Sequence, residues 1–95
     1  MINFALCDDN VNILDHLEKM LENIFTKNNF DARVTFKSSN STDMIDFISK
    51  NKVDVVLLDI NLKSNKSGLE LAKAIRNMHK NTYIIFTTGH LEYAM

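Results

Sequence analysis

The sequence lacks proline and tryptophan, and its 95 residues include only two glycines, Gly68 and Gly89, and one cysteine, Cys7. Because no proline-rich or glycine-rich linker divides the chain, we expect a single domain. One cysteine has no partner for an internal disulfide, which agrees with a reducing compartment and a cytoplasmic location. We interpret Cys7 as a small core residue, with a reactive thiol as the alternative.

Long apolar runs and an excess of one charge are also missing. No apolar run approaches the ~20 residues that cross a bilayer, so no membrane span is expected. The formal net charge is −1, from 11 basic and 12 acidic residues, and gives no broad positive surface for nucleic acid. Hydrophobic residues make up 45% of the chain, which suits a modest packed core rather than a disordered segment.

The spacing of apolar residues predicts strands that alternate with helices. Strands are expected over Ile2–Cys7, 31–36, Val53–Leu58 and Tyr83–Thr87. Helices are expected over the three-and-four spaced apolar residues of 13–25, 44–48 and 69–78. Right-handed crossovers applied to this order predict an α/β fold with a doubly wound parallel sheet.

Acidic or hydroxyl residues follow three of the predicted strands. Asp8 and Asp9 follow the first, Asp59 the third and Thr88 the fourth. Neighbouring parallel strands end at one edge of a sheet, where open α/β folds bind ligands, so we expect these side chains to form a site. Each residue alone also suits a helix cap or a turn. Their agreement on one edge favours a site.

Oxygen atoms dominate this predicted site. Carboxylates ~4 Å apart repel by about 4 kcal/mol at an effective dielectric near 20, so we expect a cation among them. Oxygen ligands favour Mg²⁺, and Asn61 can add its backbone carbonyl. Asp59 beside such a metal can attack a phosphoryl group, and Thr88 can offer its hydroxyl to a phosphoryl oxygen. The three histidines are expected in solvated or capping roles.

Four segments in this order carry a family resemblance. They are Cys7 to Asn10, Leu57 to Leu62, Gly68 to Ala72 and Phe86 to His90. In these segments the chain resembles the receiver (CheY-like) domain of two-component response regulators, and 59–71 and 90–94 are similar to regulators with a downstream LytTR-type DNA-binding domain. The resemblance implies a flavodoxin-like sheet of strand order 2-1-3-4. The fifth strand and last helix have no counterpart here, so we expect 1–95 to be a receiver domain that is incomplete at its C-terminus.

The resemblance also implies roles for the site residues. Asp59 would accept a phosphoryl group from a sensor histidine kinase. Asp9, Asp59 and the Asn61 backbone carbonyl would bind Mg²⁺, or Mn²⁺ in its place, and Asp8 would act through a metal-bound water. Thr88 would be the switch hydroxyl that couples phosphorylation to the output domain. The chain would be a signalling domain rather than an enzyme, with at most self-phosphorylation from phosphodonors and autodephosphorylation.

Two features of the family fall outside these residues. The lysine that pairs with the phosphoryl group, at the end of the fifth strand, has no counterpart, and neither does the switch aromatic on that strand. Lys63 stands where many receivers have proline. The tail from His90 to Met95 has the pattern of a helix's opening turn. Without a fifth strand, Tyr83–Thr87 would be an apolar edge. A homodimer through that strand, or through exchanged terminal elements, is therefore expected.

Two other functions stay open. One is a Mg²⁺-dependent phosphatase of haloacid dehalogenase-like type, because Asp59-Ile-Asn61 is similar in spacing to the motif of its nucleophile. Asn61 lacks the second carboxylate, and those enzymes place the nucleophile after the first strand. Steady release from a phosphate ester would indicate the phosphatase, and stoichiometric self-labelling the receiver. The other is a receiver-like binding module without phosphorylation, which failure to bind Mg²⁺ would favour.

Overall fold

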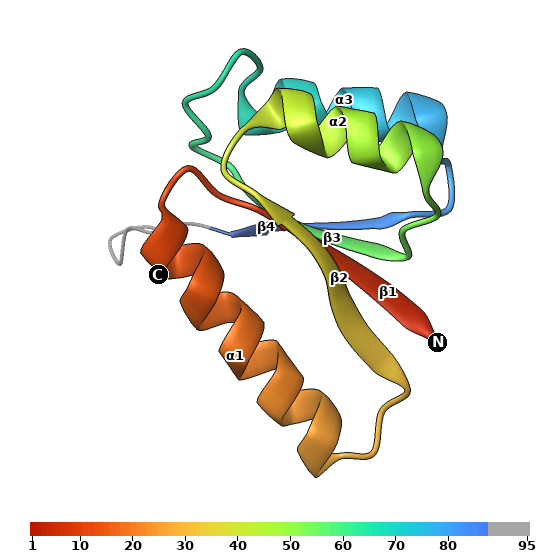
Figure 1. The fold of residues 1–95 in the computed structure, drawn as a ribbon. Coiled ribbons are helices and arrows are strands. Elements are labelled where there is room, and N and C mark those ends of the chain that lie inside the picture. Colours follow the sequence, from red (N-terminus) through yellow and green to blue (C-terminus); the bar gives the residue numbers. More distant parts are fainter. Residues whose placement is uncertain (88–95) are drawn as a thin grey trace.

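Strands and helices alternate along the chain in the computed structural model, which describes residues 1–87 (Figure 1). The elements are β1 (Ile2–Cys7), α1 (Val11–Lys27), β2 (Ala32–Ser38), α2 (Ser41–Lys50), β3 (Val55–Asp59), α3 (Gly68–Met78) and β4 (Tyr83–Thr87). All neighbouring strands are parallel, and the sheet order is β2-β1-β3-β4. The predicted doubly wound fold and its strand order are confirmed.

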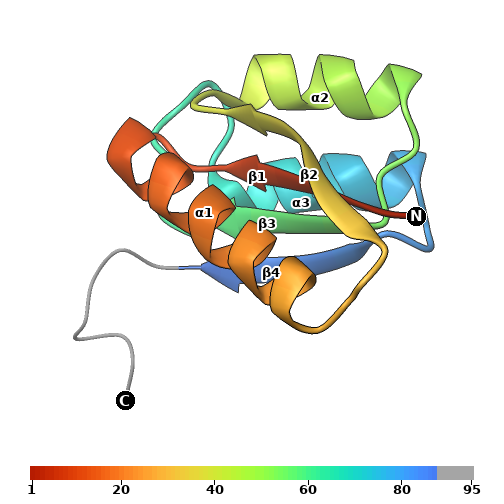
Figure 2. The ribbon, with the colours of Figure 1, turned by 60° about the horizontal axis from the view of Figure 1, so that its bottom comes forward.

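Helices cover both faces of the sheet, with α1 on one face and α2 and α3 on the other (Figures 1 and 2). Alternate residues of β3 enter two separate cores, since successive side chains of a strand point to opposite faces. Leu57 packs with Leu6 and Leu14 on the α1 face, while Val56 and Leu58 pack on the face of α2 and α3. No helix within 1–87 combines the length and apolarity that crossing a bilayer requires.

Several element boundaries differ from the sequence-based prediction, three of them for reasons that the hydrogen bonds and strand pairing show. β3 begins at Val55 rather than Val53, because the Val53 carbonyl accepts the Thr82 hydroxyl at 2.8 Å instead of joining the ladder. β2 continues to Ser38, where it pairs with the end of β1. α2 begins at Ser41 rather than near Met44, because the side chain of Asn40 caps it. In β2 and α2, polar residues at the ends hid the extensions from apolar periodicity.

β4 pairs with β3 and lies at the edge of the described sheet. Its Tyr83 and Ile85 are register partners of Val55 and Leu57, so they point to the α1 face. These two side chains are 73% and 50% exposed, because α1 covers the sheet over the other strands. Thr88 and the tail from His90 to Met95 lie outside the described residues.

Candidate functional site

Three carboxylates converge where β1 and β3 end. Asp8 and Asp9 directly follow β1, and Asp59 is the last residue of β3. The two strands are adjacent and in register, with Cys7 opposite Leu58, so their carboxyl ends lie side by side. One oxygen from each carboxylate lies within 4.8 Å of the others. The structure therefore brings together the three acids that the sequence pattern placed on one edge.

Backbone amides fix each of these carboxylates. Asp8 Oδ1 accepts the N–H of Asn10 at 2.9 Å. Asp59 Oδ1 accepts the N–H of Asn61 at 3.0 Å, and Asp9 Oδ2 accepts the N–H of Lys63 at 3.3 Å. Asp8 and Asp59 are buried, at 2% and 6% exposure, whereas Asp9 is exposed. The cluster thus consists of two sheltered carboxylates and one that faces the solvent.

The environment of the cluster opposes negative charge. Burial raises the pKa of Asp8; the Asn10 amide lowers it in part, and the charges of Asp59 and Asp9 raise it again. Burial, followed by the charges of the three acids, raises the pKa of the Cys7 thiol to about 12. Cys7 is buried in the core on the α2 and α3 face, so it is a core residue rather than a reactive thiol.

The acids line a pocket of about 200 Å³. Its walls also include Asn10, Ile13, Asn61 and Lys63. All four metal ligands predicted from the sequence, the three acids and Asn61, therefore line this pocket. Asn10 and Ile13 were not predicted as site residues. The sequence feature that could have indicated them is a helix cap. The Asn10 side chain accepts the amides of Asn12 and Ile13 at the start of α1, which brings the first turn of that helix to the pocket.

The start of α3 packs directly against the backbone of the site. Ser67 and Glu70 form a capping box at this helix end. A Cβ on Gly68 would overlap the carbonyl oxygen of Asp59 and lie 2.9 Å from both Cα and O of Ile60. Only glycine permits this approach, so Gly68 fixes the backbone on which Asp59 stands.

The expected switch hydroxyl, Thr88, lies outside the described residues. The strand before it ends at Thr87, which is the register partner of Asp59. The Thr87 carbonyl accepts the N–H of Ile60 at 3.0 Å. The end of β4 is therefore tied to the chain that leaves Asp59.

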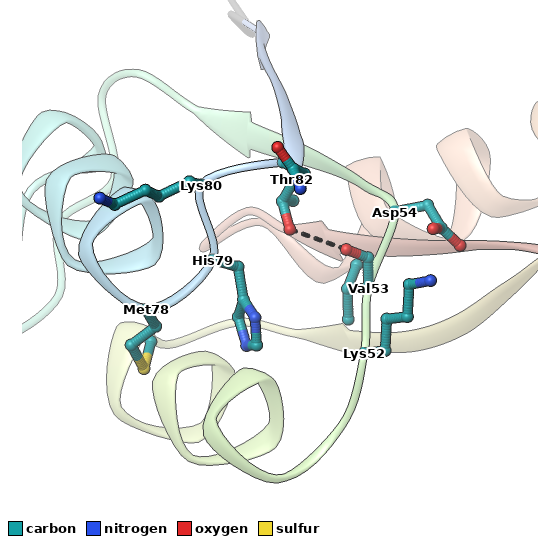
Figure 3. A pocket seen from close by; sticks show the side chains of 8 residues that line it. Lys52, Val53, Asp54, Met78, His79, Lys80 and Thr82 are labelled. Atoms are coloured by element: carbon teal, nitrogen blue, oxygen red, sulfur yellow. Dashed lines mark hydrogen bonds between the residues drawn. The ribbon is translucent and has the colours of Figure 1, made fainter.

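A larger hollow, of about 550 Å³, lies at the opposite end of the strands (Figure 3). Its lining residues are Lys52, Val53, Asp54, Met78, His79, Lys80, Asn81 and Thr82. The polar groups among them serve the fold: Asp54 Oδ2 accepts the Asn3 amide at 2.8 Å, and His79 Nε2 lies 2.8 Å from the Ile48 carbonyl. His79 ends α3, as its expected capping role requires. This hollow lacks the converging acids, so size does not identify the site.

Curated relatives of the chain are signalling proteins. It is 30% identical over 95 residues to the sensory transduction protein LytT of Bacillus anthracis, covering all of this chain and 36% of that protein. It is 37% identical over 59 residues to the sensory transduction protein LytR of Staphylococcus saprophyticus, covering 62% of this chain and 23% of that protein. The chain thus spans about a third or less of the length of these relatives.

A solved structure agrees with the fold and the sequence. The response regulator protein TrrA of Thermotoga maritima, in complex with Mg²⁺–BeF, superposes with a TM-score of 0.80 at 27% identity, covering 98% of this chain and 74% of that chain. The model of the family described as "Response regulator receiver domain" matches residues 4–95 of this chain. With the sheet order and the acid cluster already in place, this match shows that the chain belongs to the response regulator receiver domain family.

Proposed function

We propose that this receiver domain accepts a phosphoryl group on Asp59 in a Mg²⁺-dependent reaction. The observation that carries the proposal is the convergence of three carboxylates within 4.8 Å at the end of the two central strands. Asp59 is the sheltered acid on β3, which lies between β1 and β4. The family membership of the chain supports the same assignment.

The donor set fits a small hard cation. Asp9, Asp59 and the Asn61 backbone carbonyl are the proposed ligands of Mg²⁺, with Mn²⁺ as a substitute, and Asp8 acts through a bound water. All of these donors are oxygens, as Mg²⁺ prefers. The repulsion among three close acids also favours a cation. The TrrA relative was solved with Mg²⁺–BeF, which supports this choice.

The proposed chemistry is attack by an Asp59 carboxylate oxygen on phosphorus. Oδ1 accepts the Asn61 amide, and Oδ2 has no hydrogen-bond partner within residues 1–87, so Oδ2 is the proposed nucleophile. As the new P–O bond forms, the bond from phosphorus to the donor nitrogen breaks and the nitrogen keeps that electron pair. A bound Mg²⁺ supplies charge screening for the carboxylates and phosphoryl oxygens. Thr88 is the proposed switch hydroxyl.

The partners follow from the family and remain proposals for this chain. A sensor histidine kinase is the proposed phosphodonor. The proposed output is a LytTR-type DNA-binding domain of a longer protein, and the proposed location is the cytoplasm. The relatives named LytT and LytR support a signalling output. With a net charge of −1, this chain itself is not proposed to bind nucleic acid.

Self-association of the 95-residue chain is a separate proposal. β4 presents Tyr83 and Ile85 to solvent, and exposed apolar strands at a sheet edge tend to pair. Sedimentation velocity over a range of concentrations tests it. Ile85→Lys should abolish the dimer and Phe30→Lys, which changes an exposed residue before β2, should not. A chain that stays monomeric at high concentration contradicts this proposal.

Intact-mass spectrometry tests the phosphoryl acceptor. The native chain and the variants Asp59→Asn and Asp46→Asn are each incubated with Mg²⁺ and phosphoramidate. Asp46→Asn is the control, because Asp46 is an exposed acid of α2. We expect one added phosphoryl group in the native chain and in Asp46→Asn, and none in Asp59→Asn. Full labelling of Asp59→Asn contradicts the assignment. Steady turnover of a phosphate ester would indicate a phosphatase, and no labelling with no Mg²⁺ binding would indicate a non-phosphorylated binding module.

A further inference from the structure

The buried hydroxyl of Ser41 joins α2 to the loop that follows β3. Ser41 is the first residue of α2 and is 1% exposed. Its hydroxyl donates to Ser64 Oγ at 3.1 Å, and its backbone N–H donates to the same oxygen at 3.0 Å. The hydroxyl also accepts the N–H of Lys66 at 3.1 Å. The Asn65 side-chain amide also donates to the Thr42 hydroxyl at 3.0 Å, so four hydrogen bonds hold residues 64–66 against the start of α2.

The preceding part of the same loop is tied to the acid cluster. Asn61 and Lys63 donate their amides to the carboxylates of Asp59 and Asp9, and Leu62 donates its amide to the Asp59 carbonyl at 3.2 Å. Residues 61–63 thus contact the acids, while residues 64–66 contact α2. Lys63 and Ser64 are consecutive in the chain, so the contacts of Ser64 restrict where Lys63 can lie, while Leu62 anchors the loop in the core.

We infer that Ser41, together with Ser64, is a positioning pair that holds this loop in the geometry needed for Mg²⁺. The inference rests on the proposed Mg²⁺ site. Mg²⁺ demands near-ideal octahedral geometry, whereas Ca²⁺ accepts flexible and irregular coordination. A loosened loop therefore weakens Mg²⁺ binding more than Ca²⁺ binding. Selectivity between the two ions separates a positioning role from a contribution to folding alone.

Calorimetric titration of the 95-residue chain with Mg²⁺ and with Ca²⁺ tests the inference. The variants are Ser41→Ala and Ser64→Ala, and Ser49→Ala is the matched control because its hydroxyl donates only within α2, to the Asp46 carbonyl. Loss of a supporting contact around a metal site typically costs 10–100-fold in affinity. We expect Mg²⁺ affinity to fall about tenfold in the two test variants, Ca²⁺ affinity to fall less than about threefold, and Ser49→Ala to match the native chain.

The outcomes distinguish this inference from the proposed function. Ser64 is only half-buried in a loop, so Ser64→Ala tests the pair even where Ser41→Ala fails to fold. Unchanged Mg²⁺ affinity in folded Ser64→Ala, or equal loss of Mg²⁺ and Ca²⁺ affinity, overturns the positioning role. A native chain that binds no Mg²⁺ overturns the proposed metal site, and the inference with it.

Discussion

Replacing Asp59 with asparagine is expected to stabilise the metal-free chain. Asp59 lies within 4.8 Å of both Asp8 and Asp9, as measured between carboxylate oxygens. At that separation two unit charges repel by about 3 kcal/mol for an effective dielectric near 20. Solvent screens the exposed Asp9, so the net relief is smaller. We expect the free energy of unfolding to rise by about 2 kcal/mol.

The isosteric change leaves the surrounding contacts in place, since an amide oxygen can still accept the N–H of Asn61. Urea unfolding in EDTA should therefore place Asp59→Asn above the native chain, with a Tm higher by about 10 °C. Mg²⁺ should reverse this order: at 100 times Kd a ligand adds about 2.7 kcal/mol to the native chain, and little to a variant without the ligand carboxylate. Asp46→Asn, at an exposed ion pair with Lys50, is the control and should change little in either condition.

Two results would refute this reasoning separately. A variant that is no more stable than the native chain in EDTA would show that repulsion in the acid cluster is already relieved by solvent or protonation. Equal stabilisation of both proteins by Mg²⁺ would show that Asp59 is not a ligand. The first result leaves the phosphoryl acceptor assignment untouched, whereas the second contradicts the proposed metal site.

Three further predictions concern the framework of the site. Gly68→Ala should lower the free energy of unfolding by about 3 kcal/mol, because the new Cβ meets rigid backbone atoms. Urea unfolding measures this change, with Asn77→Ala, at an exposed residue of α3, as the control. Equal stability of the two variants would contradict the prediction. Cys7 should resist iodoacetamide in the folded chain and react in urea, as mass spectrometry reports; rapid alkylation of the native protein would contradict the buried, high-pKa thiol. In EDTA, the folded state holds a proton on Asp8 more tightly than the unfolded state, so its stability contribution is present below the ordinary aspartate pKa and is lost as pH rises through the raised pKa. The stability of the native chain relative to Asp8→Asn should therefore fall as pH rises through that window, and a difference that does not vary with pH would refute the shift.

Apolar periodicity was enough to predict the sheet and the position of its acids. The run from Ile2 to Cys7 matches β1, and the acids that follow it lie at its carboxyl end. Parallel pairing of β1 with β3 then fixes where Asp59 lies, because register sets both strand ends. The site's acids were predictable because they are attached to strands whose burial the sequence pattern specifies. Their metal and phosphoryl roles remain predictions.

Contacts made by polar residues far apart in sequence were not predictable. Ser41 and Ser64 lie between the predicted strands and helices, and no periodic pattern marks their hydrogen bonds. The tight approach of Gly68 to Asp59 depends likewise on how α3 packs after its loop. Such contacts depend on the final packing of elements, which local sequence patterns do not specify.

The two parts of the site differ in what holds them. Asp59 stands on β3, whose neighbouring residues Val56 and Leu58 are fully buried in the core, so moving its backbone requires disruption of the sheet. Asn61 and Lys63 stand on a loop held by polar contacts, each worth about 1 kcal/mol net, and by Leu62 between them, which packs in the core. A single polar substitution can therefore loosen the part of the loop around Ser64, which hydrogen bonds hold, without unfolding the domain. We therefore expect substitutions in the loop to change the metal affinity of variants that still fold. Substitutions that damage the core should instead disrupt the acid cluster itself.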